Sequence, residues 1–151
     1  APLAFPQAVQ AILSADLIVV GPGSLFTSLL PNLLVPDIEA AIRSSRALKI
    51  FVCNVATQPG ETDNYTCADH LRTIHDHLGD HLFDAVVCNN YFTGNLPDGS
   101  QWVRLDENLE NIYPVYQANL LDPDFPWHHD AGKLSQVLVD LLENRTGPLV
   151  E

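Results

Sequence analysis

The sequence predicts an α/β protein in which helices cover both faces of a mostly parallel sheet. Three short apolar runs, DLIVVG, KIFVCN and DAVVCNN, are typical of strands that are buried on both faces. Helical patterns lie between these runs, and strands that alternate with helices favour parallel pairing. We therefore expect a single Rossmann-like, three-layer domain over residues 1–151.

The first helices are marked by proline. PQAVQAILSA begins with Pro6, and PDIEAAIRSS begins with Pro36; proline suits the first helical position because the N–H it lacks is unpaired there in any case. Between them, GSLFTSLLPNLLV predicts a helix that is broken at Pro31. TCADHLRTIHDHL predicts the next helix, and Thr66 and Asp69 at its start resemble a capping box.

The last third of the chain is less regular. YFTGNLPDGS is expected to be a loop, and WVRLD and YPVYQANLL can each supply an extended segment. DAGKLSQVLVDLLEN is a clear amphipathic helix whose leucines and valines recur at helical spacing. It is expected to cover one face of the sheet.

The charge balance excludes some partners. Seven Lys and Arg residues stand against nineteen Asp and Glu residues, giving a formal net charge of -12. Binding to nucleic acid or to an anionic membrane surface is therefore not expected, because both depend on clustered basic side chains. No apolar run reaches transmembrane length, and the first residues lack the basic start of a signal peptide.

The cysteines indicate a reducing compartment. Cys53 and Cys88 end apolar runs, Cys67 lies on the apolar stripe of a predicted helix, and no CxxC motif is present. We expect buried thiols and a cytoplasmic protein. The chain has no methionine and starts at Ala1, so we interpret it as a piece of a longer protein.

Polar loops follow each of the three predicted strands. Because ligands of open α/β sheets bind beyond the carboxyl ends of the strands, GPGS, NVATQPGET and NNYFTG should form one rim. The ligand-binding residues predicted on this rim are Gly21, Gly23, Ser24, Thr27, Asn54, Thr57, Gln58, Glu61, Thr62 and Asn89.

GPGSLFTS could hold an anion, because Gly21 and Gly23 permit a sharp turn and Ser24 falls near a helix start with free N–H groups. It is not the dinucleotide fingerprint, since Phe26 stands where the third glycine would be, so NAD is not expected. It is also neither a Walker loop nor a nucleophile elbow. The alternative is a tight turn that Ser24 merely caps.

NVATQPGETDNY supplies neutral hydrogen-bonding groups that suit a sugar or a nucleobase. Its carboxylates, Glu61 and Asp63, would suit Mg²⁺ beside a phosphate. The alternative is a turn at Pro59-Gly60 with solvated neighbours.

Histidines offer a rival site. His70 and His77 share one flank of a predicted helix, where Asp69 could complete a zinc site. No HExxH motif is present, and no structural zinc is expected. The alternative is a set of histidines on a partly solvated flank.

In order along the chain, GPGSLFTSLLPN, NVATQPGETDNYT and the following DH resemble the second half of the bacterial gluconeogenesis-factor family, which is related to 2-phospho-L-lactate transferase. The resemblance is close over residues 6–90 and loose in the last third, where His129-Asp130 and Lys133-Leu134 resemble an element before the final helix. It implies a Rossmann-like fold and a cytoplasmic protein. Two departures stand out. The family's glycine-rich nucleotide loop is absent here, and His128 stands where an arginine is usual, with Arg104 as the nearby alternative for an anion contact.

The resemblance leaves two hypotheses open. One is a regulator of carbon metabolism and cell shape that binds a nucleotide-linked sugar such as UDP-N-acetylglucosamine. The other is a Mg²⁺-dependent transferase that moves a phospholactyl-type group from a nucleotide diphosphate donor to a deazaflavin. In either case the chain would form an incomplete half of a larger domain, whose partner is the missing half or a second copy joined at an exposed sheet edge.

Overall fold

The protein is a three-layer α/β sandwich in the computed structural model, which describes residues 2–146. Its sheet has the order β1-β2-β3-β4, with β1 at Leu17–Val20, β2 at Leu48–Val52, β3 at Ala85–Asn89 and β4 at Val115–Ala118. All neighbouring strands are parallel. The three predicted strands and the Rossmann-like arrangement are confirmed.

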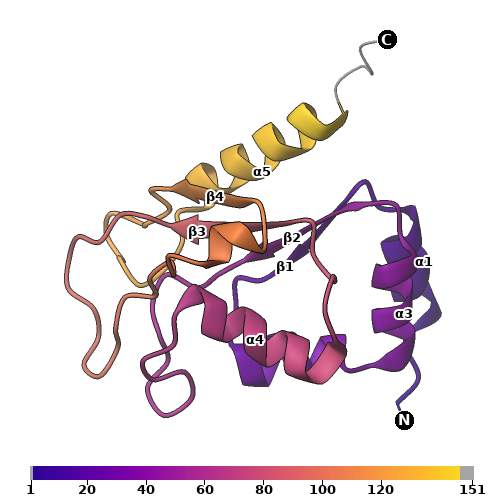
Figure 1. The fold of residues 1–151 in the computed structure, drawn as a ribbon, viewed down its shortest axis with the longest axis horizontal. Coiled ribbons are helices and arrows are strands. Elements are labelled where there is room, and N and C mark those ends of the chain that lie inside the picture. The colour runs from indigo at the N-terminus through magenta and orange to yellow at the C-terminus, as the bar shows by residue number, and fades with distance from the viewer. Residues whose placement is uncertain (1, 147–151) are drawn as a thin grey trace.

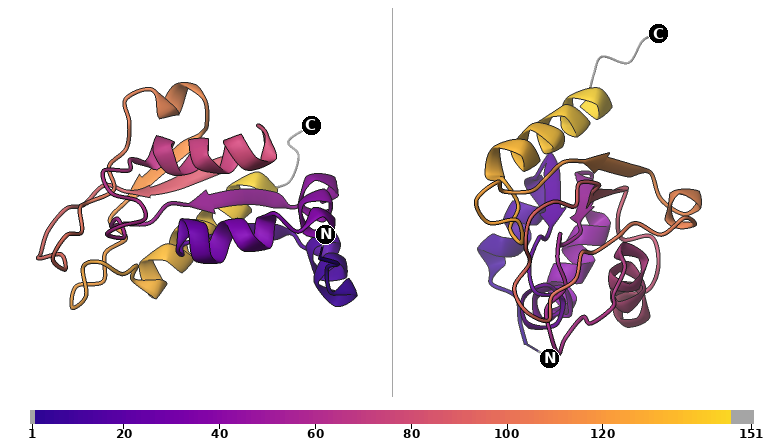
Figure 2. Two further views of the ribbon diagram at one scale, coloured as in Figure 1. Left: turned by 90° about the horizontal axis from the view of Figure 1, so that it is seen from below. Right: turned by 90° about the vertical axis from the view of Figure 1, so that its left-hand side faces the viewer.

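Helices cover both faces of the sheet. In Figure 1, α5 (Ala131–Thr146) lies on one side, and α3 (Pro36–Ser44) and α4 (Cys67–Leu78) lie on the other. The views of Figure 2 show the same layers, with α1 (Pro6–Ser14) beside α3 at one end of the molecule. The proline starts of α1 and α3 are as predicted.

Each face of the sheet has its own apolar core, because successive side chains of a strand point to opposite faces. On β2, Phe51 packs into the core beneath α3 and α4, whereas Ile50 and Val52 pack into the core beneath α5. All three side chains are almost completely buried. This two-sided burial explains the continuous apolar runs in the sequence.

The helix after β1 differs from its prediction. The chain does not break at Pro31, which lies inside α2 (Leu30–Leu33). A π-helical turn, η1 (Leu25–Leu29), precedes α2, and the Leu30 N–H bonds to the Leu25 carbonyl. The wider turn accommodates a proline that cannot donate the usual helical hydrogen bond.

The start of α4 is as predicted. The Thr66 hydroxyl accepts a hydrogen bond from the Asp69 N–H, and the Asp69 carboxylate accepts one from the Thr66 N–H, which completes a capping box. This pair fixes the residue at which the helix begins after the long loop that follows β2.

The connection from β3 to β4 runs through a long loop whose helical content is the short turn η2 (Leu109–Asn111). Within it, Trp102 makes an isolated antiparallel bridge with Ala56. Of the two segments predicted to be extended, YPVYQANLL supplies β4, whereas WVRLD adds no strand to the sheet. The loop instead closes over the segment that follows β2.

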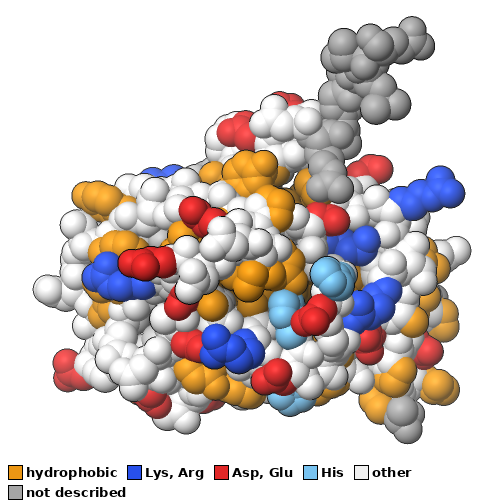
Figure 3. Space-filling model, in the orientation of Figure 1, with side chains coloured by type: hydrophobic (Ala, Val, Ile, Leu, Met, Phe, Trp, Pro, Cys, Tyr) orange, Lys and Arg blue, Asp and Glu red, His pale blue; other side chains and the backbone are white. Residues whose placement is uncertain are grey.

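Charged side chains of both signs are interspersed on the face shown in Figure 3, and histidines gather near the end of α4. Within residues 2–146, no single helix is long and apolar enough to cross a membrane. A bent pair, Leu25–Leu33 and Pro36–Ser44, passes by length and composition alone, with an angle of 74° between its halves. Leu25, Leu30 and Ile42 of that pair are buried in the core of this domain.

The turn after β1 depends on Gly21. Its φ is +85°, and a Cβ atom placed there would lie 2.5 Å from the Val52 carbonyl oxygen. We predict that Gly21→Ala lowers the free energy of unfolding by about 2 kcal/mol or more, because strain and a backbone clash add together.

The matched control is Gly23→Ala in the same loop, where an added Cβ meets only ordinary contacts at 3.5 Å or more. Urea unfolding of both variants measures the difference. Equal stabilities would contradict the prediction.

Candidate functional site

A cleft of about 580 Å³ opens beyond the carboxyl ends of β1 and β2. This volume lies in the range of small-molecule sites. Five of the predicted ligand-binding residues line it: Gly23, Ser24, Asn54, Thr57 and Gln58. The lining residues that the sequence did not predict are Pro22, Val55, Ala56, Pro59, Pro97, Ser100, Trp127, His128 and His129.

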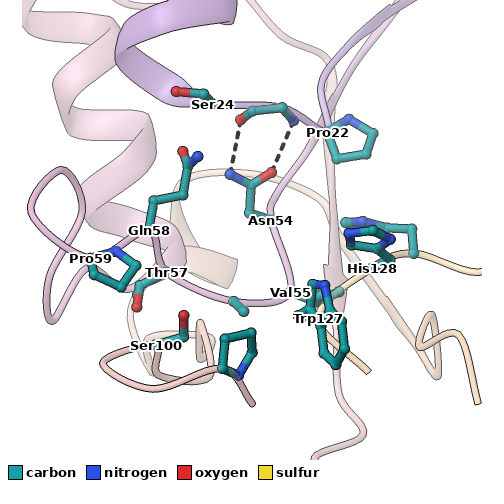
Figure 4. Close-up of a pocket in the computed structure, with 14 residues that line it drawn as sticks. Pro22, Ser24, Asn54, Val55, Thr57, Gln58, Pro59, Ser100, Trp127 and His128 are labelled. Carbon is teal, nitrogen blue, oxygen red and sulfur yellow. Dashed lines mark hydrogen bonds between the residues drawn. The ribbon is translucent and has the colours of Figure 1, made fainter. Parts of the chain in front are cut away.

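Asn54 joins the loops after β1 and β2. Its side-chain oxygen accepts a hydrogen bond from the Gly23 N–H at 3.0 Å, and its side-chain nitrogen donates one to the Gly23 carbonyl at 2.9 Å (Figure 4). The amide thus satisfies both polar groups of one residue, as a neighbouring strand would. The floor of the cleft is fixed by this pair.

Ser24 lies at the start of the π-helical turn and caps it. Its hydroxyl accepts a hydrogen bond from the Thr27 N–H at 3.2 Å and donates one to the Glu61 carboxylate at 3.0 Å. Thr27 also donates its own hydroxyl to Ser24 at 2.6 Å. Ser24 therefore caps the helical turn, as the alternative interpretation predicted. The same hydroxyl connects the GPGS loop to the loop after β2.

The threonines of NVATQPGET hold the loop in place. Thr57 is buried and pairs with Gln101: its N–H donates to the Gln101 carbonyl, and its hydroxyl accepts from the Gln101 N–H. Thr62 is buried, and its hydroxyl accepts the Gln58 N–H at 2.9 Å. Both hydroxyls thus accept hydrogen bonds from backbone N–H groups and hold the loop in its conformation.

Gln58 is different, because its side chain reaches the cleft with an unused group. Its side-chain oxygen is buried and has no hydrogen-bond partner within the described residues. A buried acceptor without a donor costs free energy. Because this oxygen has almost no exposed surface, a ligand N–H or O–H can reach it only when the Gln58 side chain turns toward the cleft that it lines.

The other predicted residues lie outside the cleft lining: Gly21, Thr27, Glu61, Thr62 and Asn89. Asn89 is buried, and its side chain accepts the Leu120 N–H and donates to the Tyr91 carbonyl. Asn89 thus holds the segment that follows β4 through its hydrogen bond with Leu120.

The two carboxylates that were predicted to bind Mg²⁺ form hydrogen bonds with different partners. Glu61 bonds to Ser24, whereas Asp63 accepts the Gly60 N–H at 2.7 Å and stabilises the turn at Pro59-Gly60. Residues 2–146 contain no group of three or more His, Cys, Asp or Glu side chains that could hold a metal ion. Mg²⁺ at these carboxylates stays a prediction.

The histidines of α4 lie on a partly solvated flank, as the alternative interpretation predicted, with His75 half-buried. His77 is exposed, but His70 is buried, and its ring packs edge-on against Tyr65. Its Nδ1 donates to the Thr66 carbonyl at 2.8 Å. Burial lowers the pKa of His70, so it is a neutral core residue.

The third wall of the cleft comes from the connection between β4 and α5. Trp127 and His128 lie across the cleft from Gln58 and Pro59 in Figure 4, and His129 also lines the cleft. The available sequence signal was the His129-Asp130 element before the last helix. Trp127 carried no signal of its own, because a lone aromatic residue in a loop does not indicate a site.

His129 is held neutral. Its Nε2 donates to the Cys53 carbonyl at 3.1 Å, which leaves Nδ1 as the acceptor. Burial lowers its pKa from about 6.5 to about 4, against the opposing effect of that hydrogen bond. The cleft lining therefore holds no fixed charge, since it includes no Lys, Arg, Asp or Glu. Arg104 lies elsewhere, with its guanidinium 4.3 Å from the ring centre of Phe92.

Three thiols lie in the apolar core on the α3 and α4 side of the sheet. Cys53, Cys67 and Cys88 are free and buried, as predicted, and the sulfurs of Cys67 and Cys88 are 2.8 Å apart. The hydrogen bond with Cys67, together with burial, raises the pKa of Cys88 far above its ordinary value. Burial likewise raises the pKa of Cys53. These thiols stay protonated and unreactive at neutral pH.

Comparison with known proteins identifies the family. Residues 1–121 match the sequence model of the family described as 2-phospho-L-lactate transferase CofD. The chain belongs to this family. The match includes the GPGS and NVATQPGET loops but not the wall that contains Trp127.

Curated relatives of the chain are called gluconeogenesis factors. The chain is 38% identical to the one from Listeria innocua over 93% of its length and 35% identical to the one from Bacillus subtilis over 91%. It spans about half of each relative, 46% in both cases. A crystal structure of a UPF0052 family member from Bacillus halodurans superposes with a TM-score of 0.81 at 37% identity, covering 91% of this chain and 47% of that one.

The depressed pKa of His129 predicts a loss of stability in mild acid. As pH falls below about 6.5, the unfolded imidazole takes up a proton, whereas the folded one stays neutral down to about 4. The free energy of unfolding should fall across this window, by up to about 3 kcal/mol from His129 alone. Burial lowers the pKa of His70 and His75 as well, so they act in the same direction.

His129→Gln keeps a donor for the Cys53 carbonyl and removes the titrating ring. Urea unfolding at pH 7 and pH 4.5 should give a smaller acid loss for this variant than for the wild type. His77→Gln, on the exposed side of α4, is the control for replacing a histidine by glutamine. The same pH dependence in His129→Gln and the wild type would refute the assignment.

Proposed function

We propose that the cleft binds a nucleotide-linked sugar of the UDP-N-acetylglucosamine type and that the protein acts as a ligand-binding regulator of carbon metabolism and, as the family resemblance implies, of cell shape. The relatives are called gluconeogenesis factors, which supports the metabolic part. The free thiols fit a cytoplasmic protein.

The observation that carries the proposal is the unpaired side-chain oxygen of Gln58, at a cleft whose lining includes no Lys, Arg, Asp or Glu. An acetamido N–H, a sugar hydroxyl or a base N–H can donate to that oxygen once the Gln58 side chain turns toward the cleft. Ser100 also lines the cleft and supplies a hydroxyl group. Neutral partners of this kind recognise sugars and bases, whereas phosphates prefer cations or free backbone N–H groups.

The same lining favours binding without turnover. Its only ionisable side chains are His128 and His129, and His129 is neutral with its Nε2 proton donated to the Cys53 carbonyl. A group already committed in this way is a poor general acid at Nε2. Within the described residues of the cleft, nothing stands out as an activated nucleophile.

A Mg²⁺-dependent transferase is the second candidate, and the description of the family favours it. Mg²⁺ commonly uses one or two carboxylates together with substrate phosphates. Glu61 suits that role, since it touches the cleft-lining Ser24, whereas Asp63 is occupied by the Gly60 N–H. When bound, the ion would neutralise the charge of a diphosphate donor; Glu61 would hold it at the mouth of the cleft.

Calorimetric titration of UDP-N-acetylglucosamine tests the first proposal. We predict saturable binding that Gln58→Ala weakens by about tenfold, because the variant removes a protein acceptor to which the ligand donates a hydrogen bond. The control is Gln136→Ala on α5, whose side chain bonds to Asp140 away from the cleft. It should bind like the wild type.

Equal affinities for the wild type and Gln58→Ala would remove the residue from the site, and no binding to the wild type would reject the proposal for this chain. Repeating the titration on the full-length Bacillus subtilis relative measures what the remainder of a whole protein adds. Mg²⁺-dependent product formation by that relative, with a nucleotide diphosphate donor and a deazaflavin acceptor, would favour the transferase instead.

A further inference from the structure

The wall opposite Gln58 carries a cluster of aromatic rings. Trp127 packs edge-to-face against Phe125 and against His128, with ring centres 5.6 Å and 5.7 Å apart. Edge packing supports the indole without covering it face to face. The Trp127 side chain is 37% exposed and lines the cleft. A large aromatic ring with free area therefore forms part of the cleft wall, where a ligand ring can contact it.

Hydrogen bonds close the loop that carries these rings. The Asp122 carboxylate accepts hydrogen bonds from the N–H groups of Asp124 and Phe125 at 2.8 Å and 3.0 Å. The His128 N–H donates to the Phe125 carbonyl, and the His128 carbonyl accepts the Asp122 N–H. The loop is thus a closed turn in which the aromatic positions are fixed before any ligand arrives. A preorganised surface loses little entropy when a ligand binds.

The base of the loop is anchored to the domain. Leu121 and His129 form an antiparallel bridge, and the Lys133 ammonium donates to the Leu121 carbonyl at 2.7 Å. His129 reaches Cys53 at the end of β2. The aromatic wall and the polar wall are therefore tied to the same strand end, at a fixed separation across the cleft.

We propose that Trp127 is a stacking platform for the planar heteroaromatic ring of the ligand, and specifically for the pyrimidine base of a nucleotide. The inference rests on the proposed function and deepens it, since it assigns the base to the Trp127 wall and leaves the polar groups near Gln58 to the sugar. Every base presents a π-face to an aromatic side chain, so stacking needs no charged partner and suits an uncharged cleft.

The two tryptophans of the chain make the experiment specific. Trp102 packs against Phe92 and does not line the cleft. The variant Trp102→Phe leaves Trp127 as the only indole, and Trp127→Phe leaves Trp102. UMP should quench the emission of Trp102→Phe saturably and leave the emission of Trp127→Phe unchanged. Quenching confined to Trp127→Phe would overturn the proposal.

Affinity provides the second readout. Trp127→Leu should bind UDP-N-acetylglucosamine about tenfold more weakly than the wild type, the usual cost of losing one stacked ring, and Trp127→Phe should lose less. N-acetylglucosamine 1-phosphate has no base, so its affinity should be the same for the wild type and Trp127→Leu. An unchanged urea midpoint would show that Trp127→Leu is folded.

The outcomes separate this inference from the proposed function. If the wild type binds UDP-N-acetylglucosamine and Trp127→Leu binds it equally well, the base lies elsewhere and only the stacking inference fails. If riboflavin quenches Trp127 and UMP does not, the platform takes a tricyclic ring, and the pyrimidine assignment is wrong. If neither the nucleotide sugar nor UMP binds the wild type, both proposals fail.

Discussion

The two hydrogen bonds between Asn54 and Gly23 hold together the parts on which the cleft depends. They join the loops after β1 and β2 at the point where the strands end and backbone pairing stops. Ser24 follows Gly23 directly, so its bond to Glu61 extends the connection toward the outside of the loop. A side-chain amide here replaces the pairing that a longer β1 would have provided.

Most polar side chains around the cleft support the loops that bear them. Thr57, Thr62 and Asn89 are buried, and their hydrogen bonds end on neighbouring backbone. This leaves few groups to meet a ligand, chiefly Gln58 and the Ser100 hydroxyl, with the aromatic ring of Trp127 opposite. Specific recognition by few groups requires that they be held still, and the buried amides and hydroxyls do this.

The sheet could be predicted because buried parallel strands leave an unmistakable pattern, such as KIFVCN, in the sequence. The loops after β1 and β2 could be predicted as a site because strand ends meet at one edge.

The roles of the individual residues within these loops could not be predicted. The sequence around Thr57 does not show whether its hydroxyl bonds to a ligand or, as the structure has it, to the Gln101 N–H. The wall containing Trp127 was missed because it reaches the cleft through tertiary contacts, such as that of His129 with Cys53, which no local spacing records. Likewise, the π-helical turn before Pro31 reflects how the chain packs on the sheet, and propensity alone predicts a break.

The three buried thiols can report on the opening of the apolar core in which they lie. Cys53 follows β2 directly, Cys67 begins α4, and Cys88 lies within β3, so each belongs to a different element of the core. A thiol that is protonated and shielded reacts with an alkylating reagent only when its surroundings open. The rate of native-state alkylation, resolved residue by residue by mass spectrometry, therefore measures how often each of these elements separates from the others.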